Sequence, residues 1–216
     1  MNENIFICYN RDMRGVVVLK EQFNDIKEVL VDFDGTLVDS TGYWTEAYRQ
    51  LCYMHNALPR NDMIERFEKL SFSSWQEKIS DQLSMSRNEA QNKLLSCAKH
   101  IYSKCEPKKA VISLISSLPS ECNITIISRE PCELVEHWLN SYGLMRISGV
   151  VNAGDERQSE SFYSGKSLLL IDDNINCCTA AKKAGATVIG VNDHHTDSQK
   201  KQMRKICDMY IEDQEV

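Results

Sequence analysis

Two acids follow a short apolar run in Val29-Leu30-Val31-Asp32-Phe33-Asp34-Gly35-Thr36-Leu37-Val38-Asp39-Ser40. Parallel strands that are buried on both faces read as continuous apolar runs, and open α/β sheets bind ligands just beyond the carboxyl ends of their strands. Asp32 is therefore predicted at that binding edge. Alternation along an extended chain turns the side chains of Asp32 and Asp34 the same way, and Gly35 lets the chain turn without a Cβ clash. We interpret the stretch as a phosphate-handling site.

Two later apolar runs also end in polar residues. The run Asn123-Ile124-Thr125-Ile126-Ile127 ends at Ser128, whose hydroxyl can donate a hydrogen bond to a phosphoryl oxygen. Backbone amides at the start of the following helix add positive potential for the same anion, although a serine in this position is also a common helix N-cap. The run Leu168-Leu169-Leu170-Ile171 ends at Asp172 and Asp173. Both runs are predicted to bring polar groups to the edge that carries Asp32.

The acids that end these runs predict a bound cation. Like charges raise one another's pKa, so the pair Asp172 and Asp173 is costly to place beside Asp32 and Asp34 unless a cation neutralises the group. Carboxylate oxygens, with substrate phosphate completing the shell, suit Mg²⁺. Asp172 is the predicted ligand. Asp173 is either a second ligand or a cap for the next helix.

These segments, in this order, resemble motifs I, II and IV of the haloacid dehalogenase-like hydrolases, and the resemblance spans roughly Val29 to Asp213. The resemblance implies that Asp32 is the nucleophile and that Asp34 is the general acid/base. It also implies a set of Mg²⁺ ligands and a set of phosphate or substrate contacts. The ligands are Asp32, Asp34 and Asp172, and the contacts are Gly35, Thr36, Ser128 and Arg129, the last of which stands where many relatives have Asn.

The family's motif III supplies a cation that balances the nucleophile and the phosphate, and here the sequence departs from the pattern. Lys166 is the obvious lysine, but it lies immediately before the strand that ends at Asp172. At ~3.3 Å per residue, Lys166 would lie nearly 20 Å from the site, at the wrong edge of the sheet. Arg157 follows the strand-like run Gly149 to Ala153 and falls at the catalytic edge. We predict that Arg157 is this cation, and the alternative is an exposed surface arginine.

Strand and helix signals alternate after Pro107, which predicts an α/β fold with a doubly wound parallel sheet. From residue 41 to residue 105 the pattern is helical throughout, so this segment is predicted as an inserted α-helical cap and residues 1–40 and 106–216 as the core. Within residues 1–25, the runs Ile5 to Cys8 and Gly15 to Leu19 suggest a β-hairpin. The predicted helices are 43–55, 62–67, 74–83, 87–104, 109–118, 132–141 and 175–184, and the predicted strands are 124–127, 149–151, 168–171, 187–191 and 207–211.

Composition argues against several classes of function. The net charge of −6 over 216 residues argues against nucleic acid as the main partner, since phosphate backbones are bound through clustered Lys and Arg. No apolar run approaches the ~20 residues that span a bilayer, so no membrane partner is predicted. The cysteines number nine, are scattered and follow no signal peptide, which indicates free thiols and a cytoplasmic protein.

The predicted activity is that of a Mg²⁺-dependent phosphatase that hydrolyses a small phosphorylated metabolite through an aspartyl-phosphate. The size and helical content of the cap resemble those of phosphoglycolate phosphatase-like and β-phosphoglucomutase-like members. A phosphomutase of the second type stays open, and so does a catalytically inactive binding protein, because the motif III cation is displaced. Tyr43 and Trp44 either line the substrate pocket or pack within the cap. A receiver domain of two-component signalling is disfavoured. Its acidic pair comes at the first strand and its phosphoacceptor at a later one, whereas here Asp32 and Asp34 come first and the acidic pair Asp172-Asp173 comes late. The oligomeric state is not predicted.

Overall fold

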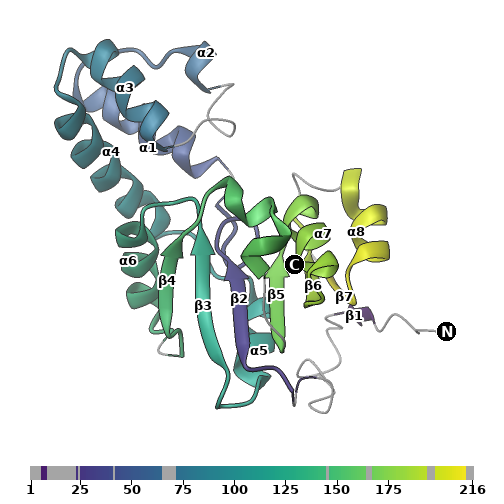
Figure 1. Ribbon diagram of the computed structural model, residues 1–216. Helices are drawn as coiled ribbons and strands as arrows, with labels where there is room; N and C mark the ends of the chain where they lie inside the picture. The colour runs from purple at the N-terminus through teal and green to yellow at the C-terminus, as the bar shows by residue number, and fades with distance from the viewer. Residues whose placement is uncertain are drawn as a thin grey trace. The chain divides into compact units, whose positions relative to one another are not determined.

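The computed structural model describes residues 6–8, 23, 25–40, 42–64, 72–144, 146–163, 167–193 and 198–212. The chain divides into two compact units (Figure 1). The sheet unit comprises residues 1–39, 107–128 and 146–216. The helical unit comprises residues 40–106 and 129–145. Each unit is described by itself.

The described part of the sheet unit contains one sheet of seven strands in the order β1-β7-β6-β5-β2-β3-β4, and all neighbouring pairs are parallel. After β2, the chain builds the sheet outward through β3 and β4 on one side and through β5, β6 and β7 on the other. This order confirms the predicted doubly wound α/β fold. The strands are β1 (Phe6–Cys8), β2 (Glu28–Asp32), β3 (Asn123–Ser128), β4 (Gly149–Asn152), β5 (Leu168–Asp172), β6 (Thr187–Val191) and β7 (Met209–Glu212).

The strand register brings polar strand ends to one level of the sheet. Val31 of β2 pairs with Ile126 of β3 on one side and with Ile171 of β5 on the other. Asp32 and the last residue of β5, Asp172, therefore lie side by side, and Ser128 lies one residue further along β3. Every residue of β5 is buried, which explains its unbroken apolar run.

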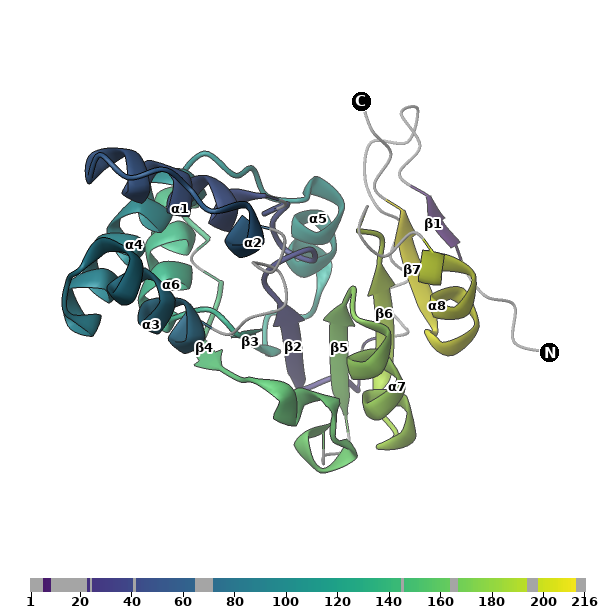
Figure 2. The same cartoon turned by 90° about the horizontal axis from the view of Figure 1, so that it is seen from above.

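Helices cover both faces of this sheet. Figure 2 shows α5 (Lys109–Ser117) on one face, and α7 (Ile175–Lys183) with α8 (Lys200–Ile206) on the other. Helix α7 begins after Asn174, whose side chain accepts hydrogen bonds from the backbone amides of Asn176 and Cys177. Two short 3-10 helices, η3 (Asp155–Gln158) and η4 (Glu160–Tyr163), follow β4.

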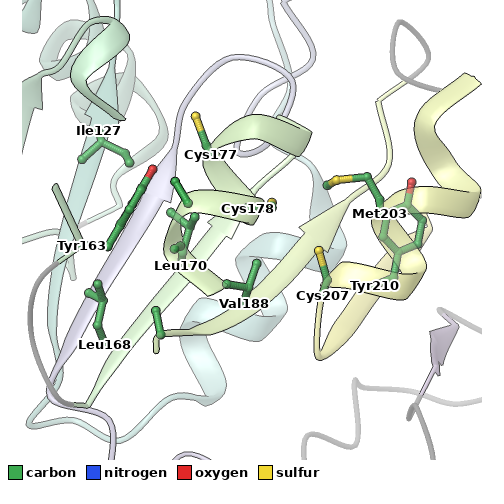
Figure 3. Close-up of a cluster of buried hydrophobic side chains, with 13 residues drawn as sticks. Ile127, Tyr163, Leu168, Leu170, Cys177, Cys178, Val188, Met203, Cys207 and Tyr210 are labelled. Carbon is green, nitrogen blue, oxygen red and sulfur yellow. The ribbon is translucent and has the colours of Figure 1, made fainter. Parts of the chain in front are cut away.

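A cluster of buried apolar side chains packs α7 and α8 onto β5, β6 and β7 (Figure 3). Leu170 and Val188 are fully buried within it, as is the thiol-bearing Cys177. Burial and the nearby Asp172 carboxylate raise the pKa of the Cys177 thiol to about 12, so this thiol is protonated and unreactive at neutral pH. Every cysteine whose side chain the structure describes is a free thiol, as the sequence indicated.

The helical unit is built around a long central helix. Helix α4 begins after Ser86, whose side chain accepts a hydrogen bond from the backbone amide of Glu89 at 3.2 Å. Its apolar side chains, which include Ala90, Leu94, Ala98 and Ile101, are buried, and the helix contacts its neighbours in this unit. The helices of this unit are α1 (Tyr43–Met54), α2 (Asn61–Ile64), α3 (Phe72–Leu83), α4 (Arg87–Tyr102) and α6 (Cys132–Tyr142).

Helix α6 groups with the helical unit, whereas the sequence placed it in the core. The Trp138 indole donates a hydrogen bond to the carbonyl of Cys105 at 2.9 Å, and Lys99 of α4 pairs with Glu133.

The rings of Tyr43 and Trp44 lie 6.3 and 5.9 Å from that of Tyr102, centroid to centroid. These contacts favour packing within the cap for the two aromatic residues.

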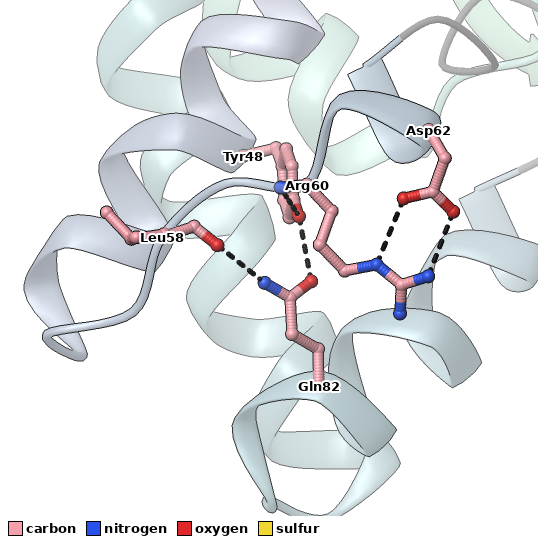
Figure 4. A network of polar contacts seen from close by, with 5 residues as sticks. All are labelled: Tyr48, Leu58, Arg60, Asp62 and Gln82. Carbon is pink, nitrogen blue, oxygen red and sulfur yellow. Dashed lines mark hydrogen bonds and ion pairs between the residues drawn. The ribbon is translucent and has the colours of Figure 1, made fainter.

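A polar network fixes the connection between α1 and α2 (Figure 4). The Tyr48 hydroxyl donates to Gln82 of α3 at 2.7 Å and accepts from the backbone amide of Arg60 at 3.0 Å. The Gln82 amide donates to the Leu58 carbonyl at 3.1 Å, and the Arg60 guanidinium forms two hydrogen bonds to Asp62. The network therefore ties the segment from Leu58 to Asp62 to two helices.

At the N-terminus, β1 pairs in parallel with β7. The second run of the predicted hairpin, Gly15 to Leu19, lies outside the described residues. The last residues of the predicted helix 62–67 also lie outside them. Among the helices that the structure describes, none has both the length and the apolar character needed to cross a membrane.

Candidate active site

A tight turn carries the chain away from the carboxyl end of β2. The amide of Gly35 donates to the carbonyl of Val38 at 2.9 Å, and the amide of Val38 donates to the carbonyl of Phe33 at 3.1 Å. Gly35 has φ +78°, and a Cβ placed on it would lie 2.9 Å from a carboxylate oxygen of Asp173. Glycine is required here both for its backbone conformation and for the space it leaves to Asp173.

Three carboxylates meet at this edge of the sheet. One oxygen each from Asp32, Asp172 and Asp173 lies within 4.8 Å of the others, and all three residues are buried. Oδ1 of Asp172 accepts a hydrogen bond from the amide of Asn174 at 2.7 Å, but its Oδ2 is buried and accepts none from the described residues. The hydroxyl of Thr36 donates to Asp173 at 2.9 Å.

The environment makes the charged forms of two of these acids costly. Burial raises the pKa of Asp172 well above its usual value, and the charges of Asp32 and Asp173 raise it further. Burial likewise raises the pKa of Asp173, with contributions from Asp32 and Asp193, while the Thr36 hydrogen bond and the Lys108 ammonium lower it. The charges of these carboxylates are therefore only partly compensated by positive charge.

Arg157 supplies part of that charge. It lies in η3, immediately after β4, and its guanidinium forms an ion pair with Asp32 although it is only 5% exposed. The position agrees with the predicted one at the catalytic edge, and the alternative of an exposed surface arginine is wrong. Lys166 lies outside the described residues.

A second buried cation, Lys108, was missed in the sequence. Its ammonium donates hydrogen bonds to the carbonyls of Gly35 at 2.6 Å and Asn192 at 2.8 Å, and lies 3.8 Å from Asp193. One signal was present: Lys108 is the N-cap residue of α5, where a positive charge faces the positive end of the helix dipole. A lysine at such a place needs compensating oxygen atoms from elsewhere in the fold.

The charges of this region fit a divalent cation. Of the described residues, the buried charged side chains comprise four carboxylates and two cations, which gives a formal net charge of −2 when all four carboxylates are ionised. They form one connected group, since Lys108 pairs with Asp193, Arg157 pairs with Asp32, and Asp173 interacts electrostatically with both pairs. The buried Asp172 oxygen without a hydrogen-bond donor offers a ligand atom, and Mg²⁺ prefers carboxylate oxygens. The residues present therefore suit Mg²⁺.

The other predicted site residues have distinct surroundings. Ser128 is buried at the end of β3, and the exposed Arg129 follows it. Asp34 is half-buried, and its carboxylate is not one of the three that cluster among the described residues. Its role as a Mg²⁺ ligand stays a prediction. Asn174, and not Asp173, caps α7, so Asp173 joins the acidic cluster instead.

Comparisons with known proteins agree with the fold. The family model described as haloacid dehalogenase-like hydrolase matches residues 29–191. No curated protein sequence matches the chain. A solved structure of a candidate beta-phosphoglucomutase from Thermotoga maritima has a TM-score of 0.67 at 15% identity and covers 87% of this chain and 94% of its own.

Two further solved structures carry ligands of interest. The candidate hydrolase YfnB from Bacillus subtilis, bound to magnesium, has a TM-score of 0.58 at 15% identity over 77% of this chain and 89% of its own. A mutant of CbbY from Rhodobacter sphaeroides, in complex with xylulose-(1,5)bisphosphate, has a TM-score of 0.62 at 13% identity over 80% of this chain and 89% of its own. At such identities these likenesses show a shared fold.

Proposed function

Because the chain belongs to the haloacid dehalogenase-like hydrolase family, we propose that it is a Mg²⁺-dependent phosphatase that hydrolyses a small phosphorylated metabolite through an aspartyl-phosphate. One observation carries the proposal. Asp32 lies buried beside Asp172 and Asp173 and is ion-paired with Arg157, at the carboxyl edge of a parallel sheet. Such an arrangement supports Asp32 as the nucleophile, at an edge where a phosphoryl group and a metal ion can both be bound.

In the first step, a carboxylate oxygen of Asp32 forms a bond to phosphorus while the bond from phosphorus to the alcohol oxygen breaks. Asp34 gives its proton to that leaving oxygen. In the second step, Asp34 takes a proton from a water molecule, the water oxygen bonds to phosphorus, and the bond to Asp32 breaks. Inorganic phosphate leaves, and both aspartates return to their starting states.

Other residues of the site support the transferring group. Arg157 orients the Asp32 carboxylate in the resting state and is positioned to bind the phosphoryl oxygens once Asp32 becomes covalently modified. Ser128 and the backbone amide of Thr36 are the proposed hydrogen-bond donors for the same oxygens, since the Gly35 amide is bonded to the Val38 carbonyl. Asp32, Asp34 and Asp172 would hold Mg²⁺, and Asp173 lies close enough to take part. When bound, Mg²⁺ supplies positive charge that offsets the negative charge of the phosphoryl oxygens.

The substrate class follows from the same chemistry. The proposed substrate is a phosphate monoester of a small polar alcohol, and the complex of CbbY with xylulose-(1,5)bisphosphate supports a sugar phosphate as the first candidate. A phosphomutase is the second candidate, favoured by the likeness to the candidate beta-phosphoglucomutase. The two differ in product: a phosphatase releases inorganic phosphate in each turnover, whereas a mutase returns a phosphate ester isomer. The ion pair of Arg157 with Asp32 weighs against an inactive binding protein, because it supports Arg157 as the displaced motif III cation.

The test is a panel of sugar phosphates and other small phosphate monoesters incubated with the protein and Mg²⁺. Phosphate release and ester isomers are measured in the same samples. The proposal predicts phosphate release that stops on chelation of Mg²⁺ and that is absent from Asp32→Asn. Isomerisation without net phosphate release would favour the mutase. The absence of both reactions across the panel, in protein shown to be folded, would favour the binding protein.

A further inference from the structure

We infer that Lys108 is a positioning residue that holds the turn carrying Asp34, and that general acid/base catalysis depends on this contact. The inference rests on the proposed function, which assigns the acid/base role to Asp34. Lys108 reaches the turn through the Gly35 carbonyl, one residue beyond Asp34. The contact therefore lies one residue from the proposed acid/base, and Lys108 acts on Asp34 through the backbone.

The Lys108 ammonium joins three segments that are distant in the sequence. It donates to the Gly35 carbonyl after β2 and to the Asn192 carbonyl after β6, and its own backbone amide donates to the Leu37 carbonyl at 2.9 Å. Asp193 provides the counter-charge at 3.8 Å. The ammonium thus makes two hydrogen bonds and one ion pair, all with oxygen atoms.

The turn is held from a second direction by Asp173. The Thr36 hydroxyl donates to this carboxylate, and the space beside Gly35 is filled by it. Lys108 thus binds the Gly35 carbonyl, and Asp173 binds the hydroxyl of the next residue, Thr36. Asp34 immediately precedes these two anchored residues, so the direction of its side chain depends on both anchors.

Burial makes the Lys108 contacts strong and specific. The side chain is 5% exposed, and that of Asp193 is 8% exposed. Hydrogen bonds from a charged donor are about twice as strong as neutral ones, and a desolvated ammonium has no water to replace a lost partner. The Gly35 carbonyl is consequently held in one place. Asp34, the preceding residue, must give and then take a proton, and such a group needs a fixed position.

The experiment replaces Lys108 with methionine, which keeps the apolar stem and removes the ammonium. The matched control is Lys109→Met, since Lys109 is the next residue and is exposed. Both variants and the wild type are assayed with aryl phosphates of similar shape, from p-nitrophenyl phosphate, whose leaving group needs no proton, to phenyl phosphate, whose leaving group gains from one.

The expected result is a loss that depends on the leaving group. For Lys108→Met, kcat/KM falls about 10- to 100-fold with phenyl phosphate but less than about 3-fold with p-nitrophenyl phosphate, because general acid catalysis contributes about 10²- to 10⁴-fold in total. With p-nitrophenyl phosphate, kcat falls more than kcat/KM and a burst of p-nitrophenol appears, since the second step still needs Asp34 as base. Equal losses with every leaving group, or no loss, would overturn the inference.

A double variant separates the positioning role from charge balance. Lys108→Met alone leaves Asp193 buried without its counter-charge and can lower stability for that reason alone. In Lys108→Met with Asp193→Asn, the charge balance returns but the contact with Gly35 does not. We expect this variant to be stable and to keep the leaving-group dependence of the single variant. Recovery of wild-type kinetics would show that Lys108 only balances Asp193.

Amide hydrogen exchange decides the structural part even if the protein releases no phosphate. The amides of Gly35, Leu37 and Val38 are hydrogen-bonded within the turn, so their exchange reports whether the turn opens. Lys108→Met should exchange these amides at least about 10-fold faster than Lys109→Met does. Unchanged exchange would overturn the positioning role. Faster exchange in a protein without phosphatase activity would keep that role and refute the proposed function.

Discussion

Asp172→Asn should stabilise the metal-free protein while destroying its response to Mg²⁺. Asp172 is fully buried, with like charges on Asp32 and Asp173. At the 4.8 Å limit of this cluster, a like-charge pair costs about 3 kcal/mol in an effective dielectric of ~20. Arg157 offsets part of the two repulsions. The asparagine oxygen can still accept the hydrogen bond from Asn174, so the net gain is about 2 kcal/mol, or roughly 4–8 °C in Tm.

The pH dependence of this effect has a definite sign. The folded-state pKa of Asp172 is raised above the unfolded value near 3.9, so the folded state binds the proton more tightly. The resulting stabilisation of the metal-free wild type is complete below the unfolded pKa and is lost as pH rises through the folded pKa. The side chain introduced by Asp172→Asn does not titrate, so the variant does not lose this stabilisation. The difference in free energy of unfolding between the variant and the wild type should therefore grow as pH rises from about 4 toward neutrality.

Thermal unfolding in EDTA and in Mg²⁺, at several pH values, measures both effects. Saturating Mg²⁺ at about 100 times its Kd should stabilise the wild type by about 2.7 kcal/mol and leave Asp172→Asn nearly unchanged. Asp25→Asn is the control, because Asp25 is exposed in the same unit and its replacement should change stability by less than about 0.5 kcal/mol. A variant less stable than the wild type in EDTA at neutral pH would refute the electrostatic reasoning.

Three other experiments test separate parts of the structure. Arg157→Ala should lower kcat/KM by an amount that corresponds to about 2–4 kcal/mol of lost transition-state stabilisation, because Asp32 and the phosphoryl group lose a buried cation. Lys166→Ala should change kcat/KM little, and the reverse order in steady-state kinetics would contradict the assignment. Gly35→Ala should destabilise the protein by about 1–3 kcal/mol in urea unfolding, since φ is +78° and the new Cβ would crowd Asp173; wild-type stability would show that the turn adapts. Trp138→Phe should cost about 1 kcal/mol by removing the hydrogen bond to the Cys105 carbonyl, and an unchanged urea midpoint would show that the bond is not needed.

The sheet and the acidic cluster could be predicted because their causes are local in the sequence. Each catalytic strand is an unbroken apolar run that ends in a polar residue, and parallel pairing aligns such ends at one edge. Strand geometry also located Arg157, since counting residues from the end of β4 is enough to place it at that edge. These arguments need a strand direction and a rise per residue, and nothing about neighbouring helices.

Features that depend on tertiary packing could not be predicted in the same way. The contacts of Lys108 come from loops after β2 and β6, which only the finished fold brings together. The choice between Asp173 and Asn174 as the α7 cap was open because both side chains suit an N-cap, and the Thr36 hydrogen bond to Asp173 is a contact across the sheet. Helix α6 alternates with strands like a core helix, but Trp138 packs it with the helical unit.

The most direct test of the account is to trap the covalent intermediate on Asp32. The protein is mixed with Mg²⁺ and a phosphate ester that it hydrolyses, quenched in acid within one turnover, and digested for mass spectrometry. We predict a phosphoryl group on the peptide that contains Asp32, at the Asp32 carboxylate, with no label in Asp32→Asn or in the presence of EDTA. Phosphate release by Asp32→Asn at the wild-type rate, or label on another residue, would contradict Asp32 as the nucleophile.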